Sequence, residues 1–62
     1  MDKIVYYELD VVKCNHPSAN GMYGTIVHVL GESNGEWFYI LEINEPVHML
    51  IDVSENDLEE VE

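Results

Sequence analysis

Positive charge is scarce in this chain. Its 62 residues include two lysines, Lys3 and Lys13, and no arginine, against 13 aspartates and glutamates, so the formal net charge at pH 7 is −11. A surface that binds DNA or RNA needs clustered basic side chains to neutralise phosphates, and this composition excludes that function. We expect any partner protein to be basic, because opposite charges attract over distance.

The chain has only one cysteine and no long apolar run. Cys14 is the only cysteine, so the chain cannot form an internal disulfide, and a buried thiol in a reducing compartment is expected. No apolar run approaches the roughly 20 residues of a membrane-spanning helix. The opening Met1-Asp2-Lys3 leads into strand-like sequence without the apolar core of a signal peptide. These absences predict one cytoplasmic domain over residues 1–62.

The chain nevertheless has enough apolar content to fold. Hydrophobic residues make up 47% of it, which is too much for a chain that stays disordered. A domain of this length buries only about 60% of the surface that its unfolded chain exposes. Domains with so little core often add a metal, a disulfide or an oligomer interface.

Turn-forming residues divide the sequence into short apolar runs. The runs cover residues 4–14, 24–30, 36–43 and 47–53. A polar loop over 15–21 separates the first two, and Asn34-Gly35 marks a tight hairpin turn before the third. Asn44-Glu45-Pro46 ends the third run. Strands joined by short turns, with no run of helical length, predict an all-β meander.

The end of the chain is expected to form one helical turn and one last strand. Ser54 is suited to cap a helical turn, since acidic residues follow it directly. Residues 58–61 then return as a short final strand. The acidic side chains of this segment form either a solvated edge or a surface that faces a partner; they are Glu55, Asp57, Glu59, Glu60 and Glu62.

Alternation along the third and fourth runs places apolar side chains on both faces of the sheet. The first set fills the interior and comprises Trp37, Tyr39, Leu41, Ile43, Val47, Met49, Ile51 and Val53. The second set consists of Phe38, Ile40 and Leu50, which share their face with Glu42, His48 and Asp52. A small barrel has one interior, so we expect the second set to form an oligomer or partner interface. A symmetric dimer is the commonest solution.

One stretch resembles a known pattern. Residues 21–27, Gly-Met-Tyr-Gly-Thr-Ile-Val, resemble the G-x-x-G-x-(V/I) turn of KOW-type and other SH3-like small barrels. The glycines, Gly24 among them, are expected to allow a positive φ at the entry to a strongly bent strand.

Further motifs extend the resemblance over residues 8–60. Glu8-Leu9-Asp10-Val11-Val12 lies upstream, and Leu41-Glu42-Ile43 and the segment 53–58 lie downstream. This order is similar to a family of short uncharacterised bacterial proteins with an E-L-D-V-V … G-T-I-V … D-L layout, some of which lie beside toxin-like genes. The resemblance implies a five-stranded SH3-like small barrel with a short helical turn before the last strand. KOW domains that bind RNA are typically basic, and this chain is not.

Candidates for catalysis or metal binding are few. Cys14 and His16 could supply two metal ligands, but a closed zinc site needs four, and no second cysteine is present. The same two residues could act as nucleophile and base, yet no orienting acid is signalled and the domain is too small for a deep cleft. His28 and His48 are either cross-strand neighbours that share a site or ordinary outward-facing side chains. We expect no metal, no cofactor and no enzymatic activity.

These expectations combine into a small acidic, non-enzymatic protein-binding module, for example an antitoxin-like or immunity-like inhibitor of a basic partner. Acids would steer the partner, and exposed aromatic and aliphatic side chains would hold it. The expected contact residues are Tyr6, Tyr23, Trp37, Phe38, Ile40, Leu50, Glu55, Asp57, Glu59 and Glu60. For the aromatic ones, a place in the core is the alternative. Two other functions remain open: a structural accessory protein that forms a homo-oligomer, and a nucleic-acid mimic.

Overall fold

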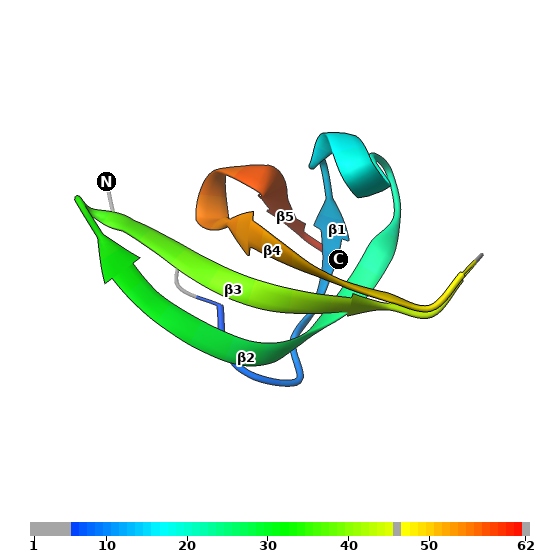
Figure 1. Ribbon diagram of the computed structural model, residues 1–62, viewed down its shortest axis with the longest axis horizontal. Coiled ribbons are helices and arrows are strands. Elements are labelled where there is room, and N and C mark those ends of the chain that lie inside the picture. Colours follow the sequence, from blue (N-terminus) through cyan, green and yellow to red (C-terminus); the bar gives the residue numbers. More distant parts are fainter. Residues whose placement is uncertain (1–5, 46, 62) are drawn as a thin grey trace.

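A computed structural model describes residues 6–45 and 47–61 of the chain. Its strands form one antiparallel sheet with the order β4-β3-β2-β1-β5 (Figure 1). The elements are β1 (Val11–Cys14), η1 (Pro17–Ala19), β2 (Tyr23–Ser33), β3 (Glu36–Ile43), β4 (Met49–Ser54), η2 (Glu55–Asp57) and β5 (Leu58–Glu60), where η denotes a 3-10 turn. The predicted all-β fold of five strands, with a short helical turn before the last one, is confirmed.

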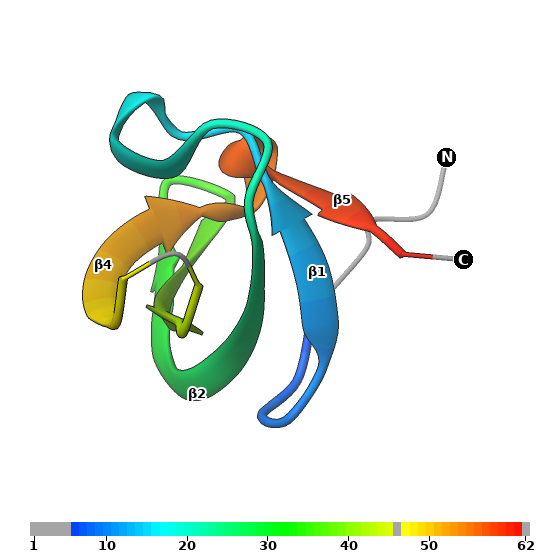
Figure 2. The same cartoon turned by 90° about the vertical axis from the view of Figure 1, so that its right-hand side faces the viewer.

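The sheet curls without closing into a complete barrel. Figures 1 and 2 show β2 and β3 as a long curved hairpin, with β1 and β5 lying across one end of it. β4 pairs with β3, and β5 pairs with β1. Within the described residues no ladder joins β4 to β5, so these two strands form the ends of the sheet. The expectation of a barrel is therefore met in strand number but not in closure.

The hairpin between β2 and β3 follows from its turn residues. Asn34 and Gly35 have φ values of 53° and 80°, as a two-residue type I′ turn requires. β2 does not stop at Gly31, as its sequence suggested, but continues to Ser33 opposite Glu36. Two register shifts in β2 allow it to bend and still remain paired with β3.

The first apolar run is mostly not a strand. Asp10 N donates to the carbonyl oxygen of Tyr7 at 3.1 Å, which closes a turn ahead of β1. Leu9 lies in that turn with a φ of 74°. The predicted run over 4–14 is therefore reduced to the four residues of β1, and its residues 4 and 5 lie outside the described part of the chain. β4 likewise begins at Met49 rather than at Val47.

The core lies on the inner face of the curled sheet. Its buried apolar side chains are Tyr6, Val12, Cys14, Ala19, Ile26, Tyr39, Leu41, Ile43, Val53 and Leu58. Trp37, Met49 and Ile51 are partly buried against them. The predicted inner set of β3 and β4 is thus confirmed except for Val47, which is 64% exposed because it precedes the strand.

Tyr6 is a core residue, which corrects the expectation that it is an exposed contact. Its side chain is only 6% exposed, and its ring meets that of Tyr39 edge-on with a centroid distance of 5.9 Å. The amide of Tyr6 donates to Tyr39 Oη at 3.1 Å. Tyr6 therefore fixes the segment before β1 against the middle of β3.

Gly24 is needed for space rather than for its φ. A Cβ atom at position 24 would lie 2.9 Å from the carbonyl oxygen of Glu42 and 3.0 Å from Ile43 Cγ1. The expected positive φ is found instead at Gly21, where φ is 82°. The prediction of a positive φ is thus wrong for Gly24, whose role is to leave space for the neighbouring strand.

Candidate protein-binding surface

Several large apolar side chains stay exposed in this fold. They are Tyr7, Leu9, Val11, Tyr23, Val27, Leu30, Val47, Leu50 and Val61. Three of them belong to the turn before β1 and to β1 itself, which is too short to hide them. A surface of this kind can bind a protein, provided that its apolar residues are contiguous.

The outer face of β1 and β2 brings two of these residues together. Val11 pairs with Thr25, and Lys13 pairs with Tyr23, so these four side chains share one side of the sheet. Val11 is 54% exposed and Tyr23 is 58% exposed. We call this group the β1–β2 face. Tyr23 is one of the contact residues that the sequence suggested, whereas Val11 is not.

Two shallow hollows flank Val11. The larger, of about 290 Å³, is lined by Tyr6, Tyr7, Asp10, Val11, Val12, Glu60 and Val61, and we call it the Tyr6–Glu60 hollow. The smaller is lined by Val11, Tyr23, Gly24, Thr25, Glu42, Asn44 and Glu45. Both combine apolar walls with carboxylates, and neither is deep enough to enclose a cofactor.

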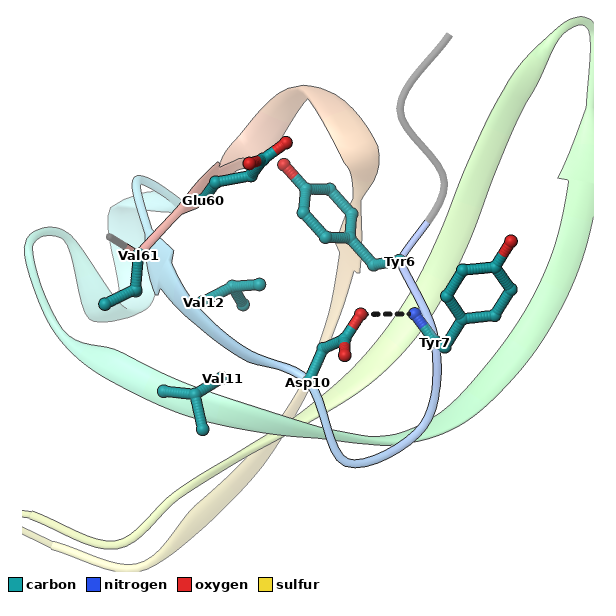
Figure 3. A pocket seen from close by; sticks show the side chains of 7 residues that line it. All are labelled: Tyr6, Tyr7, Asp10, Val11, Val12, Glu60 and Val61. Atoms are coloured by element: carbon teal, nitrogen blue, oxygen red, sulfur yellow. Dashed lines mark hydrogen bonds between the residues drawn. The ribbon is translucent and has the colours of Figure 1, made fainter.

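The Tyr6–Glu60 hollow lies between the turn before β1 and the end of β5 (Figure 3). The ring of Tyr6 points toward Glu60, whereas the ring of Tyr7 lies on the other side of its chain segment (Figure 3). Asp10 Oδ2 accepts a hydrogen bond from the amide of Tyr7 at 2.8 Å, which fixes this carboxylate at the edge of the hollow. Two carboxylates from separate elements therefore border one small cavity.

Among the described residues, two carboxylates and no basic side chain line this hollow, which favours a negative potential there. Burial raises the pKa of the Tyr6 phenol, and the carboxylate of Glu60 raises it further, followed by Tyr39, Glu55 and Glu59. Nearby negative charge has this effect because it disfavours a second anion. A cation is the ligand that such a potential attracts.

Two of the four acids expected to steer a partner hold the fold instead. Glu55 Oε1 accepts a hydrogen bond from the amide of Trp37 at 2.7 Å. Asp57 Oδ2 accepts from the amide of Ser54 at 3.2 Å, and the Ser54 side chain accepts from the amide of Asp57, which completes a capping box around η2; Ser54 Oγ also accepts from Asn56 N. Both acids are half-buried, which corrects the expectation that they are exposed.

The other two acids of this segment are exposed. Glu59 pairs with Lys13 across the strands and also accepts a hydrogen bond from Asn15 Nδ2. Glu60 pairs with Val12 and borders the Tyr6–Glu60 hollow. These two carboxylates are placed where a partner can reach them.

The second apolar set occupies the outer face of β3 and β4, as expected. Phe38 and Ile40 are half-buried, and Leu50 is 58% exposed. Polar or small residues flank them, since Ile40 lies between His28 and Asp52. Trp37, on the opposite face, is also half-buried and packs against the core. The patch is therefore smaller and more interrupted than the sequence pattern suggested.

Cys14 and His16 are held by local hydrogen bonds to the backbone. Cys14 is fully buried, burial raises the pKa of its thiol, and its sulfur accepts a hydrogen bond from the amide of His16. His16 Nδ1 accepts from the amide of Ser18 at 3.1 Å. Among residues 6–45 and 47–61, no cluster of three or more potential ligands could hold a metal.

His28 and His48 are not cross-strand neighbours. His28 belongs to β2 and His48 precedes β4, so β3 separates them. Each has its own acidic neighbour instead. His28 Nδ1 lies 3.9 Å from Glu8 Oε2, and His48 Nε2 lies 2.9 Å from Glu42 Oε2.

Sequence reasoning missed the residues around the turn before β1. Asp10 and Val61 line the larger hollow, and Tyr7 and Leu9 are strongly exposed beside it, yet the sequence pattern assigned them to strands or to no site at all. The signal available was the E-L-D triplet, because an acidic residue next to Val11 interrupts the apolar run. Its meaning depends on the turn, which brings Asp10 close to the end of β5.

No protein-family model matches the chain, and neither the curated proteins nor the solved structures contain a significant match to it. The chain has no helix, within its described residues, of the length and apolar character needed to cross a membrane.

Proposed function

We propose that this protein is a small acidic, non-enzymatic module that binds a basic protein partner. The observation that carries the proposal is the β1–β2 face, where Val11 and Tyr23 are more than half exposed beside carboxylate-lined hollows. Apolar side chains in such a position favour contact with a protein surface rather than with water. The net charge of −11 selects which proteins can approach.

The exposed acids and the exposed apolar side chains have different roles in binding. Long-range attraction by the exposed acids raises the rate of encounter, and it weakens as salt screens it. Short-range packing of Tyr23 and Val11 governs how long the complex lasts, because tyrosine is a favoured anchor at interfaces. An antitoxin-like or immunity-like inhibitor that occludes a basic enzyme would use both effects.

A comparative capture experiment tests this function. The full chain and a Val11→Ser, Tyr23→Ser double variant carry the same net charge, so ion exchange alone retains the same proteins on both. We expect the wild-type chain to retain one or a few basic proteins that the variant loses. Equal retention by both chains, or retention of acidic proteins only, would contradict the proposal.

A homo-oligomer is the second candidate, and one observation favours it. β4 is an end strand of the sheet, and its Leu50 is 58% exposed on the same face as Phe38 and Ile40. End strands and exposed apolar side chains are the usual sites of self-association. Phe38→Glu should then lower the mass seen by light scattering without unfolding the chain. A monomer mass for the wild-type chain at high micromolar concentration argues against this candidate.

A further inference from the structure

The Tyr6–Glu60 hollow has the chemistry of a site for one long cationic side chain. Its volume of about 290 Å³ is at the lower limit for small-molecule sites, so it suits a single side chain better than a cofactor. Val11 and Val61 are both exposed and supply apolar surface that matches an aliphatic stem. Asp10 and Glu60 supply carboxylates at its border.

These two carboxylates come from different elements. Asp10 ends the turn before β1 and is held there by its hydrogen bond to the amide of Tyr7. Glu60 ends β5 opposite Val12, and its exposed carboxylate borders the hollow from the other side. The planar fork of an arginine, with five donors, suits a site bordered by carboxylates better than a lysine ammonium, which is a compact point charge.

An arginine in the hollow has to come from another molecule, because this chain contains none. The one lysine among the described residues, Lys13, lies on the outer face between Glu59 and Tyr23. A second copy would also bring a further charge of −11, which disfavours close approach. The charge of the hollow and the composition of the chain together point to a basic partner.

Exposed apolar side chains border the hollow and extend the surface for such a partner. Leu9, which is 80% exposed, is next to Asp10 in the turn before β1, and Tyr7, which is 66% exposed, lies in the same turn with its ring on the far side of the segment (Figure 3). A protein segment that inserts its cationic side chain can therefore pack its neighbouring residues on this turn.

We propose that the Tyr6–Glu60 hollow receives an arginine side chain of the basic partner, whose guanidinium is attracted by the carboxylates at the border of the hollow and whose stem packs on Val11 and Val61. This inference rests on the proposed function and assigns it a specific place on the molecule. The partner's arginine would be recognised as part of a protein segment and not as a free amino acid.

The test is a titration of the full chain, followed through its backbone amide NMR signals. The probes are a hexa-arginine peptide amide, a hexa-lysine peptide amide and free arginine amide, at about 0.15 M salt. We expect saturable shifts confined to residues 6–12 and 59–61. We expect affinity for hexa-arginine about fivefold above that for hexa-lysine, which corresponds to the gain of a fork-like pairing over a point charge. Free arginine amide should bind weakly at the same residues.

Matched variants distinguish binding at the hollow from non-specific attraction to the acidic surface. Glu60→Gln and Val61→Ser should each weaken hexa-arginine binding about threefold or more. Asp52→Asn and Val47→Ser make the same chemical changes at other exposed positions and should leave binding nearly unchanged. The position of the melting transition of each variant checks that the fold is retained.

Three results would overturn the inference. The first is equal affinity for the two peptides with shifts spread over all acidic residues. The second is an equal loss in the control variants, and the third is no saturable binding of hexa-arginine. If a captured basic protein binds Glu60→Gln as well as it binds the wild-type chain, the inference that the hollow receives an arginine is wrong, but the proposed function is still supported. If neither peptide nor protein binds, both fail.

Discussion

Gly24 of β2 and Leu41 of β3 are in such close contact that a Cβ atom at position 24 would lie 2.8 Å from Leu41 Cγ. No side chain fits there unless the strands move apart. The close approach of β2 and β3 at this point therefore leaves no room for even one methyl group.

Gly24→Ala should lower the free energy of unfolding by about 3 kcal/mol, because it inserts a carbon into a space that Leu41 and the Glu42 carbonyl already fill. Urea denaturation measures the loss. Gly21→Ala is the control, since φ there is 82° but no atom lies within 4 Å of the added Cβ. We expect it to cost about 1 kcal/mol from backbone strain alone. A smaller loss at Gly24 than at Gly21 would show that the contact is not tight.

The capping box of η2 gives a second prediction. Asp57→Ala removes the acceptor for the Ser54 amide and should destabilise the fold by about 1 kcal/mol. Asp52→Ala removes the same charge from an exposed position of β4 and should cost less than half as much. Equal urea midpoints for the two variants would mean that the cap contributes nothing.

Alkaline pH should lower the free energy of unfolding. Burial raises the pKa of both Cys14 and Tyr6 in the folded state, so the unfolded chain releases these protons first. Stability is therefore full below the ordinary thiol pKa of about 8.5 and falls as pH rises through that value and then through about 10.

Urea midpoints between pH 7 and about 10.5 follow this loss. Cys14→Ala is expected to start from lower stability, because it leaves a small gap in the core, but to remain flat to higher pH. A wild-type midpoint that stays constant up to about pH 10 would contradict the effect of burial on these two groups.

We predict that Leu9 contributes to binding of the partner rather than to the stability of the fold. It has a φ of 74° and is 80% exposed, so it carries backbone strain without burying its side chain. Leu9→Gly should leave the free energy of unfolding unchanged or raise it by up to about 1 kcal/mol, because glycine adopts this conformation without strain. The same change should weaken binding of the basic partner. A clear loss of stability would show that Leu9 has a structural role.

Local chemistry explains which parts of the fold were predictable. Asn34-Gly35 determines its own turn type, and the alternation of apolar residues along β3 correctly predicts Tyr39, Leu41 and Ile43 as core residues. Ser54 also marked the helical turn that it caps. In each case residues close together in the sequence decide the outcome.

The candidate site was harder to predict because it depends on distant contacts. Leu9 does not favour a positive φ, so no residue preference reveals the turn before β1. Asp10 and Glu60 are 50 positions apart in the sequence and border the same hollow only because β5 pairs with β1. Glu55 looked like a surface charge until the fold placed it beside the amide of Trp37.

The central claim is that the acids guide a basic partner and the β1–β2 face holds it. The most direct measurement is the association and dissociation rate of the protein obtained in the capture experiment, across a series of salt concentrations. We predict that the association rate falls steeply with salt and becomes slower and less salt-dependent in a Glu59→Gln, Glu60→Gln variant, while Val11→Ser with Tyr23→Ser mainly speeds dissociation. An association rate indifferent to salt and to these acids would contradict the account and leave the acidity as a feature of solubility.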